Sequence, residues 1–372
     1  MIFTSDNASG AHPAVLAALA AANEGYTMPY GADDGTGRVE ALLREIFEAP
    51  EARVFLVATG TAANGLALAT LAQPWSSIWC HRIAHIEADE CNAPEFFSGG
   101  AKLSLLDGPG AKLDAAELDA ALAAAGAGGV HHAQPGALSL TQATEQGAVY
   151  TVTEIEALAE TAHARGLRVH MDGTRFANAL AASNATPAAM SHRAGVDILC
   201  LGATKCGALG AEAVILFDPA LAWEFELRRK RGGHLFSKMR FLSAQMEAWL
   251  AAGLWLRLAA QANAMGARLA EGLRARGVPI VSPAEANLLF VHFTAAQHAA
   301  LQAAGARYYA DPLQDPGTLG TPGALGAGAV SARLVASYAT QAQDVDRFLD
   351  ALPVSAPLPN APGLQASASV AP

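Results

Sequence analysis

The chain contains only five lysines, and one of them lies in a setting suited to covalent chemistry. Lys205 follows the apolar run 197–203 (DILCLGA) and precedes CGALG, so its amine is expected at the carboxyl end of a buried strand. Burial lowers the pKa of a lysine and frees its lone pair, as Schiff-base formation requires. The alternative is a lysine that marks the solvent end of a strand. The other four are expected to be surface or loop charges: Lys102, Lys112, Lys230 and Lys238.

A carboxylate ends another apolar run. The segment 167–175 (LRVHMDGTR) places Asp172 at the end of a second buried strand. A buried carboxylate needs a cationic partner, and a protonated pyridine nitrogen would serve. Pyridoxal phosphate (PLP) pairs a Schiff-base lysine with an acid at its ring nitrogen, so Lys205 and Asp172 together favour a PLP site. The alternative is an Asp172–Arg175 ion pair that holds a turn.

The run 59–64 (TGTAAN) supplies a candidate phosphate site. Gly60 allows close approach of the backbone, Thr61 offers a hydroxyl, and the amides of the following helix N-terminus would point at an anion. A Gly-Thr turn alone is weak evidence for a phosphate site, because most such turns only connect a strand to a helix. The order of phosphate cup, aspartate and lysine along the chain is more specific. Neither GxGxxG nor GxxxxGK[ST] occurs, so dinucleotide and P-loop sites lack their fingerprints.

Composition and charge restrict the function classes. Of 372 residues, 52% are hydrophobic and 16% charged, which excludes disorder over most of the chain. The net charge of −10 argues against a general nucleic-acid binder, and no run is apolar enough to span a membrane. No secretory signal is recognised, and the four cysteines form no CxxC pair, so we expect a cytoplasmic protein. No metal site is expected, because the spacing of the four candidate ligands matches no common zinc pattern: Cys80, His81, His85 and Cys91.

The elements that must position these residues alternate between short apolar runs and amphipathic stretches, the pattern of an α/β fold. A helix is predicted to begin at Thr153 and Glu156, which have capping-box spacing, and to end at Gly166. One large sheet covered by helices is expected from seven predicted strands: 54–58, 76–80, 102–106, 137–143, 167–172, 197–203 and 211–217.

The second half of the chain has a different sequence pattern, with fewer short apolar runs and longer helical stretches. Residues 219–277 are predicted to form long helices with one interruption at Gly232-Gly233, and 287–350 a smaller α+β unit. That unit contains a Gly/Pro loop at 311–329, and the Pro, Ala and Ser-rich tail is expected to be disordered. The predicted division is an N-terminal segment 1–30, a large PLP-binding domain 31–245, a small C-terminal domain 246–352 and the tail 353–372.

These motifs resemble the PLP-dependent threonine aldolase and β-eliminating lyase family of fold type I, in particular its low-specificity threonine aldolases. The resemblance extends from SDN (5–7) to RLVAS (333–337). It implies an α/β fold in which helices enclose a mainly parallel seven-stranded sheet, with a small α+β C-terminal domain. The matching stretches include YGADD (30–34), TGTAAN (59–64), 84–103, 140–150, HMDGTR (170–175), GATKCG (202–207) and SKMRFLSAQ (237–245).

The resemblance also implies roles for the matching residues. Lys205 corresponds to the Schiff-base lysine and Asp172 to the partner of the pyridine nitrogen. The phosphate cup matches Gly60, Thr61 and Ala62. Arg175 would bond the PLP ring hydroxyl, and His85 would stack over the ring and handle the β-hydroxyl proton.

Further roles concern the substrate and the assembly. Ser5 and Arg333 match the pair that grips the substrate carboxylate. Tyr30 is expected from a neighbouring subunit, and Arg231 or its neighbours would reach the partner's phosphate. The family implies a homo-oligomer, a dimer at least and a tetramer in full. Glu145 occupies the place of a histidine in the better-known branch, so His85, a water, Glu145 or Asp89 remain candidates for the β-hydroxyl proton.

The implied activity is cleavage of L-threonine, L-allo-threonine and other β-hydroxy-α-amino acids to glycine and an aldehyde. A β-eliminating lyase or an aminotransferase on the same scaffold is the nearest alternative. A catalytically silent PLP-binding homologue is another, and the intact set of Lys205, Asp172 and Arg333 argues against it.

Overall fold

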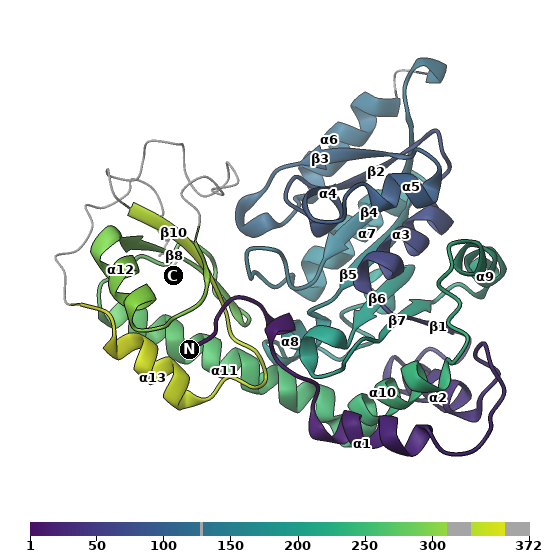
Figure 1. Ribbon diagram of the computed structural model, residues 1–372. Coiled ribbons are helices and arrows are strands. Elements are labelled where there is room, and N and C mark those ends of the chain that lie inside the picture. The colour runs from purple at the N-terminus through teal and green to yellow at the C-terminus, as the bar shows by residue number, and fades with distance from the viewer. Residues whose placement is uncertain (127–128, 311–328, 354–372) are drawn as a thin grey trace.

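The computed structural model describes residues 1–126, 129–310 and 329–353. Within these ranges the larger lobe is built on a seven-stranded sheet of order β1-β7-β6-β5-β4-β2-β3 (Figure 1). Only β7 runs antiparallel to its neighbours, so the predicted mainly parallel sheet is confirmed. All seven predicted strands are present: β1 (Arg53–Val57), β2 (Ser76–His81), β3 (Lys102–Leu106), β4 (Gln134–Thr141), β5 (Arg168–Gly173), β6 (Ile198–Gly202) and β7 (Glu212–Leu216).

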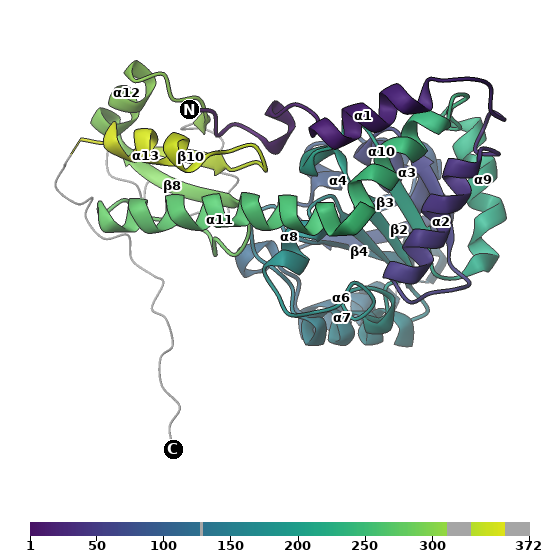
Figure 2. The same ribbon diagram turned by 90° about the horizontal axis from the view of Figure 1, so that it is seen from below.

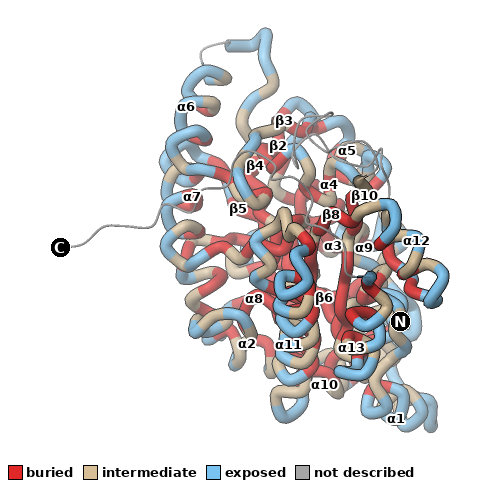
Figure 3. Tube along the Cα trace, turned by 90° about the vertical axis from the view of Figure 1, so that its left-hand side faces the viewer, coloured by how far each residue is buried: buried red, intermediate tan, exposed pale blue. Residues whose placement is uncertain are grey.

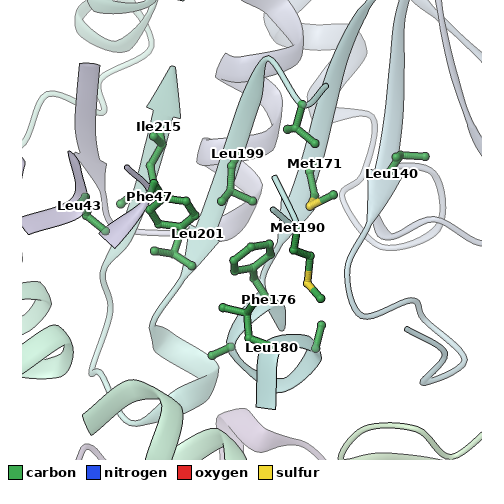
Figure 4. Packing of buried hydrophobic residues seen from close by; sticks show 14 of the residues in the cluster. Leu43, Phe47, Leu140, Met171, Phe176, Leu180, Met190, Leu199, Leu201 and Ile215 are labelled. Atoms are coloured by element: carbon green, nitrogen blue, oxygen red, sulfur yellow. The ribbon is translucent and has the colours of Figure 1, made fainter. Parts of the chain in front are cut away.

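Helices cover both faces of this sheet, because successive strand side chains point to opposite faces. On β6, Leu199 and Leu201 pack into one core, shown in Figure 4, and Ile198 and Cys200 into the other. The first face is covered by α2 (Asp34–Ile46), α6 (Ala115–Gly126), α7 (Val152–Ala164), α8 (Phe176–Ala181) and α10 (Arg240–Leu250). The opposite face is covered by α3 (Gly60–Leu71) and α9 (Ala222–Arg231). Shorter helices α4 (His85–Ala88) and α5 (Ala93–Ser98) follow β2, and α1 (Pro13–Ala22) packs on α10.

Helix α7 begins two residues earlier than predicted. Its N-cap is Thr151, whose Oγ1 accepts the Glu154 N–H at 3.2 Å while Glu154 Oε2 accepts the Thr151 N–H at 2.7 Å. The predicted capping box of Thr153 and Glu156 is therefore wrong, because Thr153 lies inside the first helical turn. The predicted end is confirmed: Gly166 follows the helix with a left-handed φ of 76°.

The helical region after β7 contains two breaks rather than one. The predicted break at Gly232-Gly233 is confirmed, since α9 ends at Arg231. A second break separates α10 from α11 (Leu254–Ala275), where Ala252 and Gly253 have φ values of 49° and 70°. Helix α11 then runs along both lobes (Figure 2), with its first turns in the core of the large sheet and its last turns in that of the small one.

The smaller lobe holds, in its described part, an antiparallel sheet of order β8-β10-β9. Its elements are β8 (Leu288–Thr294), α12 (Ala295–Ala303), β9 (Tyr309–Ala310), β10 (Ala329–Val335) and α13 (Ala342–Asp350). The predicted α+β unit is thus confirmed. The N-terminal segment joins this lobe, because the Phe3 N–H bonds the Arg307 carbonyl at 2.8 Å and the Phe3 ring packs in its core.

The predictions for the Gly/Pro loop, the C-terminal tail and the domain division stay predictions. Most of the 311–329 loop and all but the first residue of the 353–372 tail lie outside the described residues. The division after residue 245 stays a prediction, and helix α10 continues across it into the large core.

Figure 3 shows the buried strands of both sheets at the centre, with the exposed faces of α1 and α12 outside.

Candidate active site

A cavity of about 610 Å³ lies at the carboxyl edge of the large sheet. Thr59, Gly60 and Thr61 line it from the start of α3, His85 from the start of α4, and Lys205 from the turn after β6. Parallel strands deliver the residues that follow them to one edge, and α/β folds bind ligands there. The cavity therefore unites segments that are far apart in the sequence.

Lys205 lies in the short helix η5 (Thr204–Cys206), directly after β6, and its ammonium is enclosed. Burial and the nearby Arg175 guanidinium lower the pKa of Lys205, although Asp6, Asp172 and Glu212 act in the opposite direction. A buried amine with a lowered pKa is a nucleophile for a carbonyl. The surface alternative for Lys205 does not fit this position.

Asp172 is fully enclosed at the end of β5 and is held by neutral donors. Its Oδ2 accepts from Asn64 Nδ2 at 2.9 Å, and its Oδ1 accepts from the Thr174 N–H at 3.0 Å and from the Thr174 hydroxyl at 2.6 Å. Burial raises the pKa of Asp172, but His85, the Thr174 hydrogen bonds and Lys205 outweigh it, so the pKa lies below its ordinary value. An ionised carboxylate here suits a protonated ring nitrogen.

Arg175 does not pair with Asp172. Its guanidinium makes a two-pronged ion pair with Asp6, with Nε–Oδ2 and Nη2–Oδ1 distances of 2.9 and 3.0 Å. The Asp172–Arg175 turn alternative is therefore wrong. The structure instead ties Arg175 to the N-terminal segment and keeps the Asp172 carboxylate for the cavity side.

His85 is bound on two sides by carboxylates. Its Nδ1 lies 2.7 Å from Glu90 Oε1, and its backbone N–H donates to Glu145 Oε1 at 2.8 Å. The hydrogen bond to Glu90 raises the pKa of His85, and Asp172 adds to this against the opposing effects of burial and Lys205. Burial raises the pKa of Glu145 to about 7.

The start of α3 leaves backbone amides for an anion. Thr59 caps the helix by accepting the Ala62 N–H on Oγ1 at 3.2 Å, so the amide of Ala62 is already engaged. In the described part of the chain the amides of Gly60 and Thr61 have no such partner, and both residues line the cavity. The helix N-terminus and Lys205 line the cavity, and the ionised Asp172 is bonded to two of its lining residues, Asn64 and Thr174. This arrangement fits the phosphate, carbonyl carbon and ring nitrogen of PLP.

The small lobe places Arg333 beside the N-terminal segment. Arg333 Nη2 donates to the Thr4 carbonyl at 3.4 Å, next to Ser5, and its guanidinium carbon lies 4.9 Å from the centroid of the Tyr309 ring. Its buried Nε has no hydrogen-bond partner among the described residues. Ser5 itself caps a short helix by accepting the Asn7 N–H at 3.2 Å. This arrangement suits a carboxylate ligand that Ser5 and Arg333 would share.

Three of the predicted site residues are exposed in this chain and do not line the cavity. Tyr30 is 50% exposed, with Lys230 Nζ 5.1 Å from the centroid of its ring. Arg231 is exposed at the end of α9, and Asp89 is exposed after α4, within electrostatic reach of Arg333. The roles expected for Tyr30 and Arg231 in a neighbouring subunit stay predictions.

Sequence reasoning missed Glu90, Asn64 and Asp6. Each stands inside a stretch that carries the resemblance, but its type and spacing give no separate signal.

Among the described residues, the side chains close enough to hold a metal ion are His85, Glu90 and Asp172, with donor atoms within 4.8 Å of one another. The quartet of Cys80, His81, His85 and Cys91 does not form such a group in the described structure. The Asn64 amide bridges the carboxylates of Glu90 and Asp172.

Comparisons with known proteins identify the family of the chain. The model of the family described as "Beta-eliminating lyase" matches residues 3–296. The chain is 44% identical over 309 residues to a low specificity L-threonine aldolase of Pseudomonas aeruginosa, covering 82% of this chain and 88% of the relative. It is 27% identical over 270 residues to one of Saccharomyces cerevisiae, covering 72% of this chain and 68% of that relative.

Solved structures give the same grouping. A threonine aldolase of Leishmania major superposes with a TM-score of 0.86 at 29% identity, covering 94% of this chain and 97% of that chain. Serine palmitoyltransferase of Sphingomonas wittichii superposes with a TM-score of 0.65 at 17% identity, covering 94% of this chain and 86% of that chain, and shows a likeness of fold alone.

Proposed function

We propose, since the chain belongs to the β-eliminating lyase family, that it is a PLP-dependent aldehyde-lyase acting on β-hydroxy-α-amino acids. L-Threonine and L-allo-threonine would yield glycine and acetaldehyde. The observation that carries the proposal is the cavity that Lys205 and the α3 N-terminus line, with Asp172 bonded to the lining residue Asn64. The name of the Pseudomonas aeruginosa relative supports the substrate class.

The residues of the chain supply binding and proton control. The Gly60 and Thr61 amides would hold the phosphate, Asp172 would keep the ring nitrogen protonated, and Lys205 would attack the cofactor carbonyl with its lone pair. When bound, PLP supplies an electron sink for the electron pair of the Cα–Cβ bond that breaks.

Substrate orientation comes from the junction of the two lobes. Ser5 and Arg333 would fix the substrate carboxylate and so orient the substrate for cleavage of its Cα–Cβ bond. The β-hydroxyl must lose its proton as the aldehyde leaves, and His85, which lines the cavity, would accept it. Holding these groups in one geometry lowers the entropic part of the barrier.

The test is aldehyde release from L-threonine and L-allo-threonine by PLP-loaded protein, measured with a coupled alcohol dehydrogenase. The wild type is expected to release aldehyde and glycine, and Lys205→Ala to fall to the background rate. Lys102→Ala, at an exposed lysine on β3, is the matched control and should retain the wild-type rate. Ammonia or a keto acid as the steady product would instead indicate β-elimination or transamination.

We also propose a cytoplasmic homo-oligomer, a dimer at minimum and a tetramer in full. Exposed apolar side chains support an interface: Tyr26 and Met28 lie close to Tyr30 in the chain, and Phe236 precedes Ser237, whose carbonyl accepts the Tyr30 N–H at 3.0 Å. The four cysteines are unpaired, in agreement with a reducing compartment. In the described part of the chain, no helix has the length and apolarity needed to cross a membrane.

A further inference from the structure

A chain of hydrogen bonds runs from His85 through Glu90 and Asn64, which line the cavity, to the buried Asp172. The Glu90 side chain is 0% exposed, and its Oε1 lies 2.7 Å from His85 Nδ1 and 2.9 Å from Asn64 Nδ2. Asn64 Nδ2 also donates to Asp172 Oδ2 at 2.9 Å. Two carboxylates thus share one amide group, and one of them holds the histidine that lines the cavity.

We propose that Glu90 and Asn64 are positioning residues that make His85 the proton acceptor for the substrate β-hydroxyl. This deepens the proposed function and rests on it. A carboxylate can only accept a hydrogen bond, so the proton of the neutral imidazole stands on Nδ1 and the lone pair stands on Nε2. Holding Nδ1 in this way fixes both the tautomer and the orientation of the ring, as in carboxylate–histidine pairs of hydrolases.

Asn64 fixes the position of Glu90. Each of its two amide protons faces a carboxylate, and a flipped amide would turn an oxygen toward both negative groups. Its Oδ1 and Glu90 Oε2 are buried without a hydrogen-bond partner in the described structure, which costs free energy. The two hydrogen bonds of Asn64 Nδ2 outweigh this cost, so the contacts with Glu90 and Asp172 determine the orientation of the Asn64 amide.

The other candidates for the proton acceptor are placed less well. Neither Asp89 nor Glu145 is among the described residues that line the cavity, whereas His85 is. Glu145 Oε1 is occupied by the His85 N–H. The ionisable groups that face His85 are Glu90, Asp172, Lys205 and, through the backbone N–H, Glu145. Glu90 is the one that bonds the ring, and this hydrogen bond is the largest influence that raises the pKa of His85.

The test is Glu90→Gln, which keeps the side-chain shape and removes the charge. The kcat for aldehyde release is expected to fall about 10- to 100-fold, while KM stays within about twofold because the proposal has Glu90 act through His85 rather than on the substrate. The acidic limb of the kcat–pH profile should move to lower pH, since loss of the carboxylate lowers the pKa of His85. Glu90→Asp keeps the charge and should leave this limb in place even where its shorter side chain lowers kcat.

A matched control and a second readout separate positioning from a loss of structure. Glu95→Gln removes another carboxylate whose Oε2 is buried without a partner in the described residues, and it should leave kcat and the pH profile unchanged. Ring-nitrogen NMR shifts of histidine-labelled protein, assigned with His85→Gln, report the His85 tautomer and titration without turnover. They should show Nδ1 protonated in the wild type and the titration at lower pH in Glu90→Gln.

An unchanged His85 titration in Glu90→Gln, with or without a loss of kcat, would overturn the proposal. A wild type that releases no aldehyde would instead contradict the proposed function. The NMR measurement still reports the Glu90–His85 pair in that case, so the two failures are distinguishable.

Discussion

Two glutamates near Lys205 and His85 have raised pKa values: Glu212, which lines the cavity, and Glu145, which accepts the His85 N–H. Burial raises the pKa of Glu145 to about 7, although hydrogen bonds from backbone N–H groups, including that of His85, oppose it. Burial likewise raises the pKa of Glu212 to about 7, against hydrogen bonds from the Thr204 hydroxyl and the Ala203 N–H. Part of the Glu145 residue reaches solvent, but its Oε2 atom is buried. Each group exchanges its proton close to neutral pH and therefore couples pH to the state of the site.

Glu145→Gln is expected to flatten the pH dependence of stability. Because the folded pKa of about 7 exceeds the ordinary value of 4.5, the contribution of Glu145 is full below the unfolded pKa and is lost as pH rises through 7. The amide introduced by this substitution stays neutral and still accepts the His85 N–H. The variant should therefore gain about 2–4 °C in Tm over the wild type at about pH 8, and little at about pH 5.

Thermal unfolding at the two pH values measures this difference. Glu160→Gln, at an exposed position on α7, is the control and should shift Tm equally at both pH values. An equal shift in Glu145→Gln would mean that the Glu145 carboxyl titrates in the folded protein as it does in the unfolded chain.

At the scale of single residues, the sequence identifies the site residues that directly follow apolar runs. Lys205 and Asp172 were recognisable because a charged group after a buried strand is unusual. Glu90 was not, because Asp89 beside it has the same charge type and only burial separates them. Asp6 and Asn64 likewise acquire roles through partners that lie 169 and 108 positions away in the chain.

At the scale of elements, the start of α7 shows what spacing cannot decide. Two overlapping pairs, Thr151 with Glu154 and Thr153 with Glu156, satisfy the capping-box pattern. The fold selects the first, because the buried Tyr150 hydroxyl accepts the Leu113 N–H at 2.6 Å and anchors the chain one residue before the cap. The apolar runs predicted all seven strands. The antiparallel direction of β7 follows from the connection 203–211, which is too short for a parallel crossover and which the sequence prediction did not use.

Thr151→Ala is expected to destabilise the protein by about 1 kcal/mol, because it leaves the Glu154 N–H without its capping oxygen. Thr153→Ala is the matched control: the side chain is exposed inside the first turn, and its loss should change the free energy of unfolding by less than about 0.5 kcal/mol. Urea denaturation midpoints compare the two variants. A larger loss for Thr153→Ala would place the cap where the sequence first suggested it.

At the scale of the whole molecule, one ion pair joins three parts of the chain. Asp6 belongs to the N-terminal segment, Arg175 follows β5 of the large sheet, and Asn287 precedes β8 of the small lobe. Asp6 Oδ2 accepts from Arg175 Nε at 2.9 Å and from Asn287 Nδ2 at 3.2 Å. Arg333 lies on the small lobe and Lys205 on the large one, so their relative position depends on contacts of this kind and on helix α11.

Asp6→Asn is expected to cost about 3–5 kcal/mol of unfolding free energy, because it leaves the Arg175 charge buried without its counterion. The exposed pair Arg268–Asp346 has side-chain exposures of 49% and 46%, so Asp346→Asn is the control and should cost less than about 1 kcal/mol. Chemical denaturation of the two variants gives the comparison. Equal costs would mean that water reaches Arg175 when Asp6 is lost, and the N-terminal segment would then contribute little to holding the two lobes together.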